Sequence, residues 1–138
     1  MRAIRTLTHA EAQRAVVAVQ KELEKRGKAA VVAVADEHGE LLALLRIDGA
    51  RLPAIEIARN KAYTAARERC HTKDIGDAVR DPKEGFDINY YGDPRILGWG
   101  GGLPVRMEGE VVGAVAVSGL TGAEDTELAE IGVRAIGG

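Results

Sequence analysis

Two pairs of short apolar runs, each joined by a tight polar turn, set the limits on how this chain folds. The pairs are residues 29–35 and 40–47 around Asp36–Gly39, and residues 103–107 and 111–117 around Glu108–Gly109. Such turns are typical of β-hairpins, whose strands run antiparallel. The first two runs are more apolar than strands with one face in water. We therefore expect their sheet to be covered on both faces, by helices, by an oligomer partner or by both.

Helical segments surround these hairpins. Hydrophobic spacing of three and four residues and helix-capping residues predict helices over residues 8–26, 54–69 and 72–80, and a last one that opens at Thr121. Thr72 or Asp74 is the expected cap of the third helix. The resulting order is α-β-β-α-α-β-β-β-α. It predicts one α+β domain over residues 1–138, with flanking helices and an antiparallel sheet of about five strands in a profilin-like or PAS-like layout. The fifth strand would lie near Phe86–Leu97.

Composition excludes several classes of protein. The 19 basic and 21 acidic residues give a net charge of −2, which offers no basic field for nucleic acid. No apolar run approaches the roughly 20 residues of a membrane-spanning helix. The start of the chain lacks the apolar core of a signal peptide, so we expect a cytoplasmic protein. One cysteine, Cys70, and three histidines without metal-ligand spacing predict no metal site.

Glycines and aromatic residues gather in one part of the sequence. Gly98 and Gly100–Gly102 flank Trp99, and three more of the five aromatic residues are Phe86, Tyr90 and Tyr91. The glycine run fails the dinucleotide-binding fingerprint because Leu103 stands where its third glycine belongs. Its backbone N–H groups form either an anion-binding nest or a tight corner between two approaching chains. The aromatic residues form either a pocket wall or a small core under a loop.

Lys61 stands out because it lies among alanines on the second long helix, where an unpaired charge is costly to bury. It either extends to water or points into a polar pocket, and Thr64 shares its face. The candidate catalytic residues are Lys61 and Thr64, with Asp48 or Asp125 as the partner of the lysine. A serine hydrolase is excluded, because the residues before Ser118 do not form the turn of a serine nucleophile.

Several segments of the sequence carry a family resemblance: Arg46–Ala50, Ile57–Ala65, Gly100–Val105, Glu108–Gly119, Asp125 and Ala129–Val133. In this order, over nearly the whole chain, they resemble the GlcG/HbpS-like family. This family is also called the haem-degrading domain family and includes the carboxy-terminal domain of PduO-type proteins. The resemblance implies a compact fold with an antiparallel sheet, assembly into dimers or higher oligomers, and haem binding in some members.

Three functions follow from these residues and this resemblance. The first is an oligomeric protein that binds a small ligand, with haem or a related tetrapyrrole as the candidate cofactor and His71 as the candidate axial ligand. The second is an enzyme acting on a small carboxylated metabolite, with Lys61 as anchor or acid/base. The third is an accessory oligomer without a ligand. The ligand-binding candidates are Tyr90, Tyr91, Arg95, Trp99, Gly100, Gly101, Gly102 and Pro104.

Overall fold

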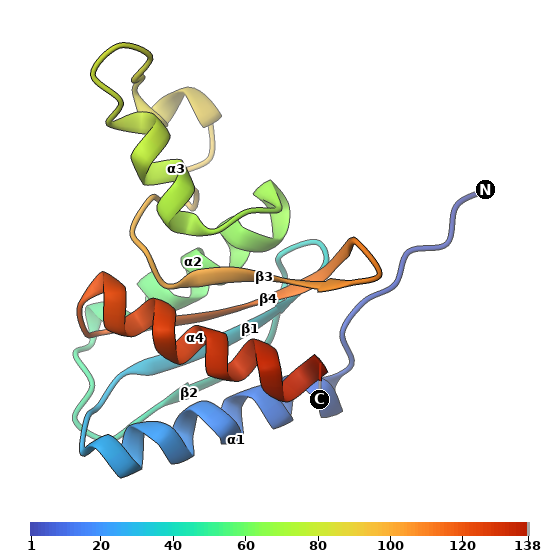
Figure 1. Cartoon of the computed structure of the whole chain (residues 1–138), viewed down its shortest axis with the longest axis vertical. Coiled ribbons are helices and arrows are strands. Elements are labelled where there is room, and N and C mark those ends of the chain that lie inside the picture. The colour runs from blue at the N-terminus through green and yellow to red at the C-terminus, as the bar shows by residue number, and fades with distance from the viewer. Residues whose placement is uncertain (138) are drawn as a thin grey trace.

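A four-stranded antiparallel sheet forms the centre of the computed structural model, which describes residues 1–137 (Figure 1). Gly138, the last residue of the expected domain, lies outside the described residues. The elements are α1 (His9–Arg26), β1 (Val31–Asp36), β2 (Leu41–Arg46), α2 (Pro53–Glu68), α3 (Thr72–Val79), the 3₁₀ helix η1 (Ile88–Tyr91), β3 (Gly102–Met107), β4 (Glu110–Ser118) and α4 (Gly122–Gly137).

The two expected hairpins are present, and they join through their first and last strands. The strand order is β2-β1-β4-β3, with β1 and β4 antiparallel at the centre. At one end of the sheet Val31 pairs with both Arg46 and Ser118. The last residues of β2 and β4 therefore lie at the same end, where α2 and α4 then begin.

Helices cover both faces of the sheet. Residues on one face of β1 and β4, including Val32 and Val117, pack with α1 and α4. On the opposite face Ala33 and Ala116 pack against Ala58 and other alanines of α2. Successive strand residues point to opposite faces, so this two-sided burial explains why β1 is apolar throughout. The expected double cover is confirmed for β1, whereas β2 is a half-buried edge strand.

Local chemistry sets most helix boundaries as expected. The Thr8 side chain accepts a hydrogen bond from the Glu11 N–H, which completes a capping box at the start of α1. Pro53 occupies the first turn of α2. The expected cap of α3 is wrong: His71 is its N-cap residue and makes no side-chain capping bond. The Thr72 hydroxyl instead accepts a hydrogen bond from the Gly102 N–H at 2.9 Å, far along the chain.

The predicted α+β architecture is confirmed, but the count of about five strands is wrong. Within the described residues the sheet has four strands, and Phe86–Leu97 holds the 3₁₀ helix η1 and irregular chain. Asp87 caps η1 by accepting the Asn89 N–H, and Gly92 ends it in a left-handed conformation. Most side chains of this segment are exposed, so it lacks the alternating burial that a strand requires. Figure 1 shows it beside α3, on the side of the edge strand β3.

Candidate functional site

A cleft of about 250 Å³ opens at the end of the sheet where α2 and α4 begin. Its walls come from the first turns of α2, the turn between β4 and α4, and the segment Trp99–Gly100. The side chains of Lys61, Ser118 and Asp125 reach it from the interior, and Arg51 lies at its exposed side. The cleft therefore joins segments that are far apart in the sequence.

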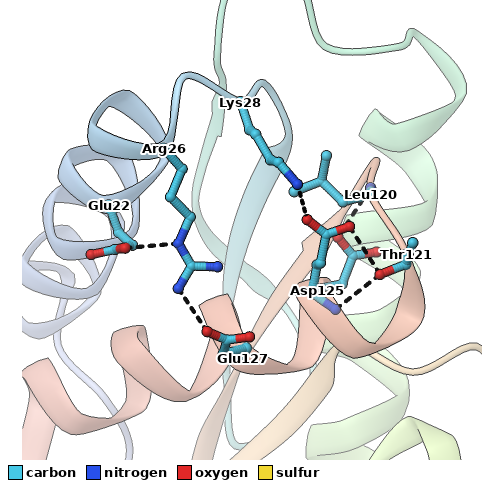
Figure 2. A network of polar contacts seen from close by, with 8 residues as sticks. Glu22, Arg26, Lys28, Leu120, Thr121, Asp125 and Glu127 are labelled. Atoms are coloured by element: carbon cyan, nitrogen blue, oxygen red, sulfur yellow. Dashed lines mark hydrogen bonds and ion pairs between the residues drawn. The ribbon is translucent and has the colours of Figure 1, made fainter.

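A buried ion pair forms the floor of this cleft. Lys61 Nζ donates to Asp125 Oδ2 at 3.1 Å and to the Val117 carbonyl at 2.9 Å. The two side chains are 2% and 3% exposed. Asp125 Oδ1 accepts a hydrogen bond from the Leu120 N–H at 3.1 Å, and Figure 2 shows these two residues close together at the start of α4. An ammonium group has three N–H donors. Within residues 1–137 only two of them have partners.

Burial shifts the titration of both partners toward their neutral forms. It lowers the pKa of Lys61 below its ordinary value, although the Asp125 carboxylate opposes that change. It raises the pKa of Asp125, against the opposing effect of Lys61. In each case desolvation, which disfavours the charged form, is the larger cause. The two shifts bring the pKa values of Lys61 and Asp125 closer together than those of solvated side chains.

The glycine run is packed directly against this pair. Gly101 has a φ of +123°, and a β-carbon there would lie 2.6 Å from the Val117 carbonyl oxygen and 2.8 Å from Lys61 Nζ. Any side chain at this position would displace the ion pair, so the tight-corner interpretation holds for Gly101. The Gly102 N–H already donates to Thr72 and is not free to bind an anion. Gly100 alone of the run lines the cleft.

The open part of the cleft has a positive electrostatic character. Arg51 makes no ion pair within the described chain and lies just before α2. Helix α4 starts at Gly122, and both the Gly100 and Gly122 N–H groups lack hydrogen-bond partners among residues 1–137. The start of a helix carries a partial positive charge and favours anions. These groups together suit a carboxylate or another small anion.

Two of the four candidate catalytic residues do not reach the cleft. Thr64 is fully buried, where its hydroxyl donates to the Arg95 carbonyl at 3.0 Å and accepts from the Leu97 N–H at 3.2 Å. It therefore holds the segment that leads to Trp99. Asp48 lies exposed in the turn after β2 and makes no ion pair within the described residues. Of the two partners that the sequence left open for Lys61, the structure brings Asp125 to it.

Most of the predicted ligand-binding residues lie outside the cleft. Tyr90 is 82% exposed, and Tyr91 packs against Phe86 with ring centroids 6.1 Å apart. Arg95 stacks over the Tyr63 ring at 4.0 Å and pairs with Asp93.

Three further candidates have different positions. Trp99, 65% exposed, lines the cleft at its edge. Pro104 lies in the edge strand β3 opposite Ala114, and His71 is exposed at the start of α3. The aromatic cluster in the sequence is therefore not one pocket wall.

Sequence reasoning missed most of the cleft lining, including two polar side chains, Arg51 and Ser118. Arg51 precedes α2 in a loop and shows no periodicity. Ser118 was weighed only as a hydrolase nucleophile, but its place at the end of an apolar strand is a signal that could have identified it. The described residues contain no cluster of three potential metal ligands. Within residues 1–137, no helix has both the length and the apolar character needed to cross a membrane.

Comparison with known proteins gives consistent matches over most of the chain. The model of the family described as haem degrading protein HbpS-like matches residues 7–134. An uncharacterised 15.0 kDa protein from the dhaT–dhaS intergenic region of Citrobacter freundii is 39% identical over 127 residues, 92% of this chain and 89% of that protein. The protein GlcG of Escherichia coli strain K12 is 38% identical over 103 residues, 75% of this chain and 74% of its own length.

Solved structures confirm the fold. The protein ORFY of Klebsiella pneumoniae superposes with a TM-score of 0.94 at 33% identity, over 99% of this chain and 94% of that one. A PduOC:haem complex superposes with a TM-score of 0.87 over 94% of both chains. Its identity to this chain is 22%, so that likeness concerns the fold alone.

Proposed function

The chain belongs to the HbpS-like family, and we propose that it is a small-molecule-binding protein whose cleft holds a small carboxylate. The observation that carries this proposal is the buried Lys61–Asp125 pair at the floor of a cleft whose open side is positive. A buried ion pair loses hydration that its mutual attraction does not fully restore. A cleft that retains such a pair, with one Lys61 N–H still unpaired, is better suited to recognition than to stability.

The expected binding mode uses groups that the protein already holds in place. The carboxylate accepts hydrogen bonds from the Gly100 and Gly122 N–H groups, and Arg51 neutralises its charge. Trp99 covers the apolar part of the ligand at the edge of the cleft. Because Lys61 and Asp125 are already fixed by Val117 and Leu120, little side-chain freedom is lost on binding.

The lining of this cleft offers no ligand for haem iron. The volume of about 250 Å³ lies below the usual range of about 300–1,000 Å³ for pockets that enclose drug-sized ligands, and a tetrapyrrole is larger than most of these. No histidine, cysteine, methionine or tyrosine lines the cleft to ligate iron. The chemistry of its lining residues thus favours a small acid.

A surface site for haem is a second candidate, and one observation favours it. Exposed Tyr90 and Tyr91 lie in η1 with Ile88, which packs in the same apolar cluster as Cys70, the residue before exposed His71. Aromatic faces and an accessible imidazole are groups that suit a haem. Assembly into oligomers, which would enlarge such a surface, and a cytoplasmic location remain predictions.

Native mass spectrometry of the protein purified from its source, followed by titration with haemin, distinguishes the two candidates. A retained organic acid of low mass, together with weak and non-stoichiometric haemin binding, is the expected result. Stoichiometric haem whose absorption spectrum changes in His71→Ala would overturn the small-acid proposal in favour of the surface site. His9→Ala is the matched control, because His9 is also exposed and lies in α1.

A further inference from the structure

Ser118 is a largely buried residue whose hydroxyl opens onto the cleft. The residue is 4% exposed, and its side chain takes part in no hydrogen bond within residues 1–137. It ends β4 on the same face of the strand as Ala116, which packs against α2, and it lines the cleft. Because this hydroxyl makes no hydrogen bond within residues 1–137 and is open only to the cleft, its partner comes from the cleft, either water or a bound ligand.

The hydroxyl lies beside the second incompletely bonded group of the floor. Its neighbour Val117 provides the carbonyl that fixes Lys61 Nζ, whose third N–H has no partner in the described part of the chain. The floor therefore offers an O–H and an N–H, whereas the open side offers Arg51 and the backbone N–H groups. These two sets of donors suit a ligand with one oxygen atom at the floor of the cleft and others at its open side.

The charge of the floor selects the chemistry of the deeper oxygen. Asp125 is a carboxylate in direct contact with Lys61, so a second carboxylate at this depth would be repelled. A neutral hydroxyl or carbonyl oxygen is compatible with it. A water molecule occupies about 30 Å³ in the liquid, so 250 Å³ holds a ligand of about eight non-hydrogen atoms.

We infer that Ser118 is a ligand-binding residue that determines specificity, and that the cleft selects short monocarboxylic acids carrying a hydroxyl or carbonyl oxygen. This inference rests on the proposed carboxylate site and names the class of its ligand. Ser118 and Lys61 bind the neutral oxygen, and the open side of the cleft binds the carboxylate. Plain fatty acids leave the floor unpaired, and dicarboxylates place a charge against Asp125.

Calorimetric titration with a matched set of probes tests this assignment. The probes are butyrate, its 2-, 3- and 4-hydroxy derivatives, and succinate, all at constant ionic strength. At least one hydroxybutyrate should bind about tenfold more tightly than butyrate, because its hydroxyl satisfies a buried polar group. Succinate should bind more weakly than that hydroxybutyrate.

Variants of the hydroxyl isolate the role of Ser118. Ser118→Ala should remove the preference for the hydroxy acid while butyrate affinity and thermal stability stay the same, since no internal hydrogen bond is lost. Ser118→Thr, which keeps a hydroxyl at this position, should retain the preference for the hydroxy acid. Thr126→Ala is the matched control, because the Thr126 hydroxyl is bonded to the Gly122 carbonyl and does not line the cleft. This variant should keep the preference.

The outcomes distinguish the role of Ser118 from the presence of a carboxylate site. Equal binding of butyrate and every hydroxybutyrate overturns the inference about Ser118 and leaves the carboxylate site standing. A preference that persists in Ser118→Ala also overturns it. A marked loss of stability in Ser118→Ala would show a structural hydroxyl and contradict the assignment. Absence of binding for all the probes would instead overturn the proposed function itself.

Discussion

Two neighbouring carboxylates at the start of α4 have opposite surroundings. Glu124 faces solvent, where it accepts a hydrogen bond from Thr121 and pairs with half-exposed Lys28. Asp125 faces inward and pairs with Lys61, with both side chains almost fully buried. Figure 2 shows the outer network, in which Arg26 of α1 also joins Glu22 to Glu127 of α4 at 2.8 Å.

This contrast indicates that the outer ion pairs are structural and that the inner Lys61–Asp125 pair is functional. The outer pairs join α1 and the segment after it to α4. Their side chains are 25% to 59% exposed and stay in contact with water, so these pairs contribute little. The inner pair loses its hydration, and burial shifts the pKa of both partners toward neutrality. Stability alone does not account for such a pair, but a need for fixed polar groups at the floor of a cleft does.

Removing the buried cation should have the largest effect. Lys61→Met leaves the Asp125 carboxylate buried with only the Leu120 N–H as a partner. Breaking a buried pair typically costs about 3–5 kcal/mol of the free energy of unfolding. Chemical denaturation measures this loss, with Lys28→Met as the control for the outer pair. Equal stability of the two variants would contradict the distinction between inner and outer pairs.

Replacing both partners should recover most of that loss. Lys61→Met combined with Asp125→Leu leaves no stranded charge, and apolar replacements of buried pairs are often neutral or stabilising. We expect the double variant to be more stable than Lys61→Met by about 2 kcal/mol or more, yet unable to bind a carboxylate probe. If the double variant is as unstable as Lys61→Met, the loss of stability comes from poorer packing in the core and not from an unpaired buried charge.

The penalty in Lys61→Met should also depend on pH. Burial raises the folded-state pKa of Asp125 above its ordinary value of 3.8, and removal of Lys61 raises it further. The unfolded chain then holds the proton less tightly than the folded chain, so stability falls as pH rises through the folded-state pKa. The difference from the native protein should therefore shrink when denaturation is measured at pH 5 instead of pH 7. A difference that stays constant would contradict a stranded carboxylate.

A smaller effect is expected at the contact between Tyr63 of α2 and the segment before the glycine run, away from the cleft. The Tyr63 hydroxyl donates to Asp93, and this bond together with Arg95 lowers the pKa of Asp93 to about 2. Its stabilising contribution is present above pH 3.8 and is lost as pH falls toward 2. Tyr63→Phe should move the Asp93 titration, followed by NMR, back toward 3.8. An unchanged titration would show that Arg95 alone holds this carboxylate.

The outer network should give the smallest effect. Glu127→Gln removes the charge that Arg26 meets on α4, but Arg26 keeps its contact with Glu22 at 2.7 Å. We expect thermal stability to change slightly at low salt and not at all in 1 M salt, where charges are screened beyond about 3 Å. A large loss of thermal stability of Glu127→Gln at high salt would contradict a weak, solvent-screened Arg26–Glu127 pair.

Features that depend on residues close together in the sequence could be predicted from the sequence. Thr8 and Glu11 are three residues apart and define the start of α1, and the turn Asp36–Gly39 defines the first hairpin. The strand expected near Phe86–Leu97 failed because clustered aromatic residues do not specify a strand without alternating burial. The Thr64 hydroxyl, rather than a sheet partner, fixes this segment at Arg95 and Leu97.

The site was predictable only in part, because its geometry depends on tertiary contacts. Lys61 stood out from its alanine neighbours, but the choice of Asp125 over Asp48 depends on a contact across 64 residues. Arg51 shows no signal in the sequence, and the place of Ser118 at the end of an apolar strand becomes informative only once the ends of β2 and β4 align. Clustering in the sequence favoured Tyr90 and Tyr91, which the fold places outside the cleft.

An NMR titration of the ¹⁵N-labelled protein with butyrate is the most direct test of a carboxylate site in the Lys61–Asp125 cleft. The amide signals of Gly100, Gly119 and Gly122, which line the cleft, should shift together and saturate. Arg51→Gln should weaken this response, whereas Arg59→Gln should not, because exposed Arg59 lies on α2 outside the cleft and faces Glu56. Shifts that are absent, or that spread over the exposed arginines and lysines without saturating, would contradict a carboxylate site in the Lys61–Asp125 cleft.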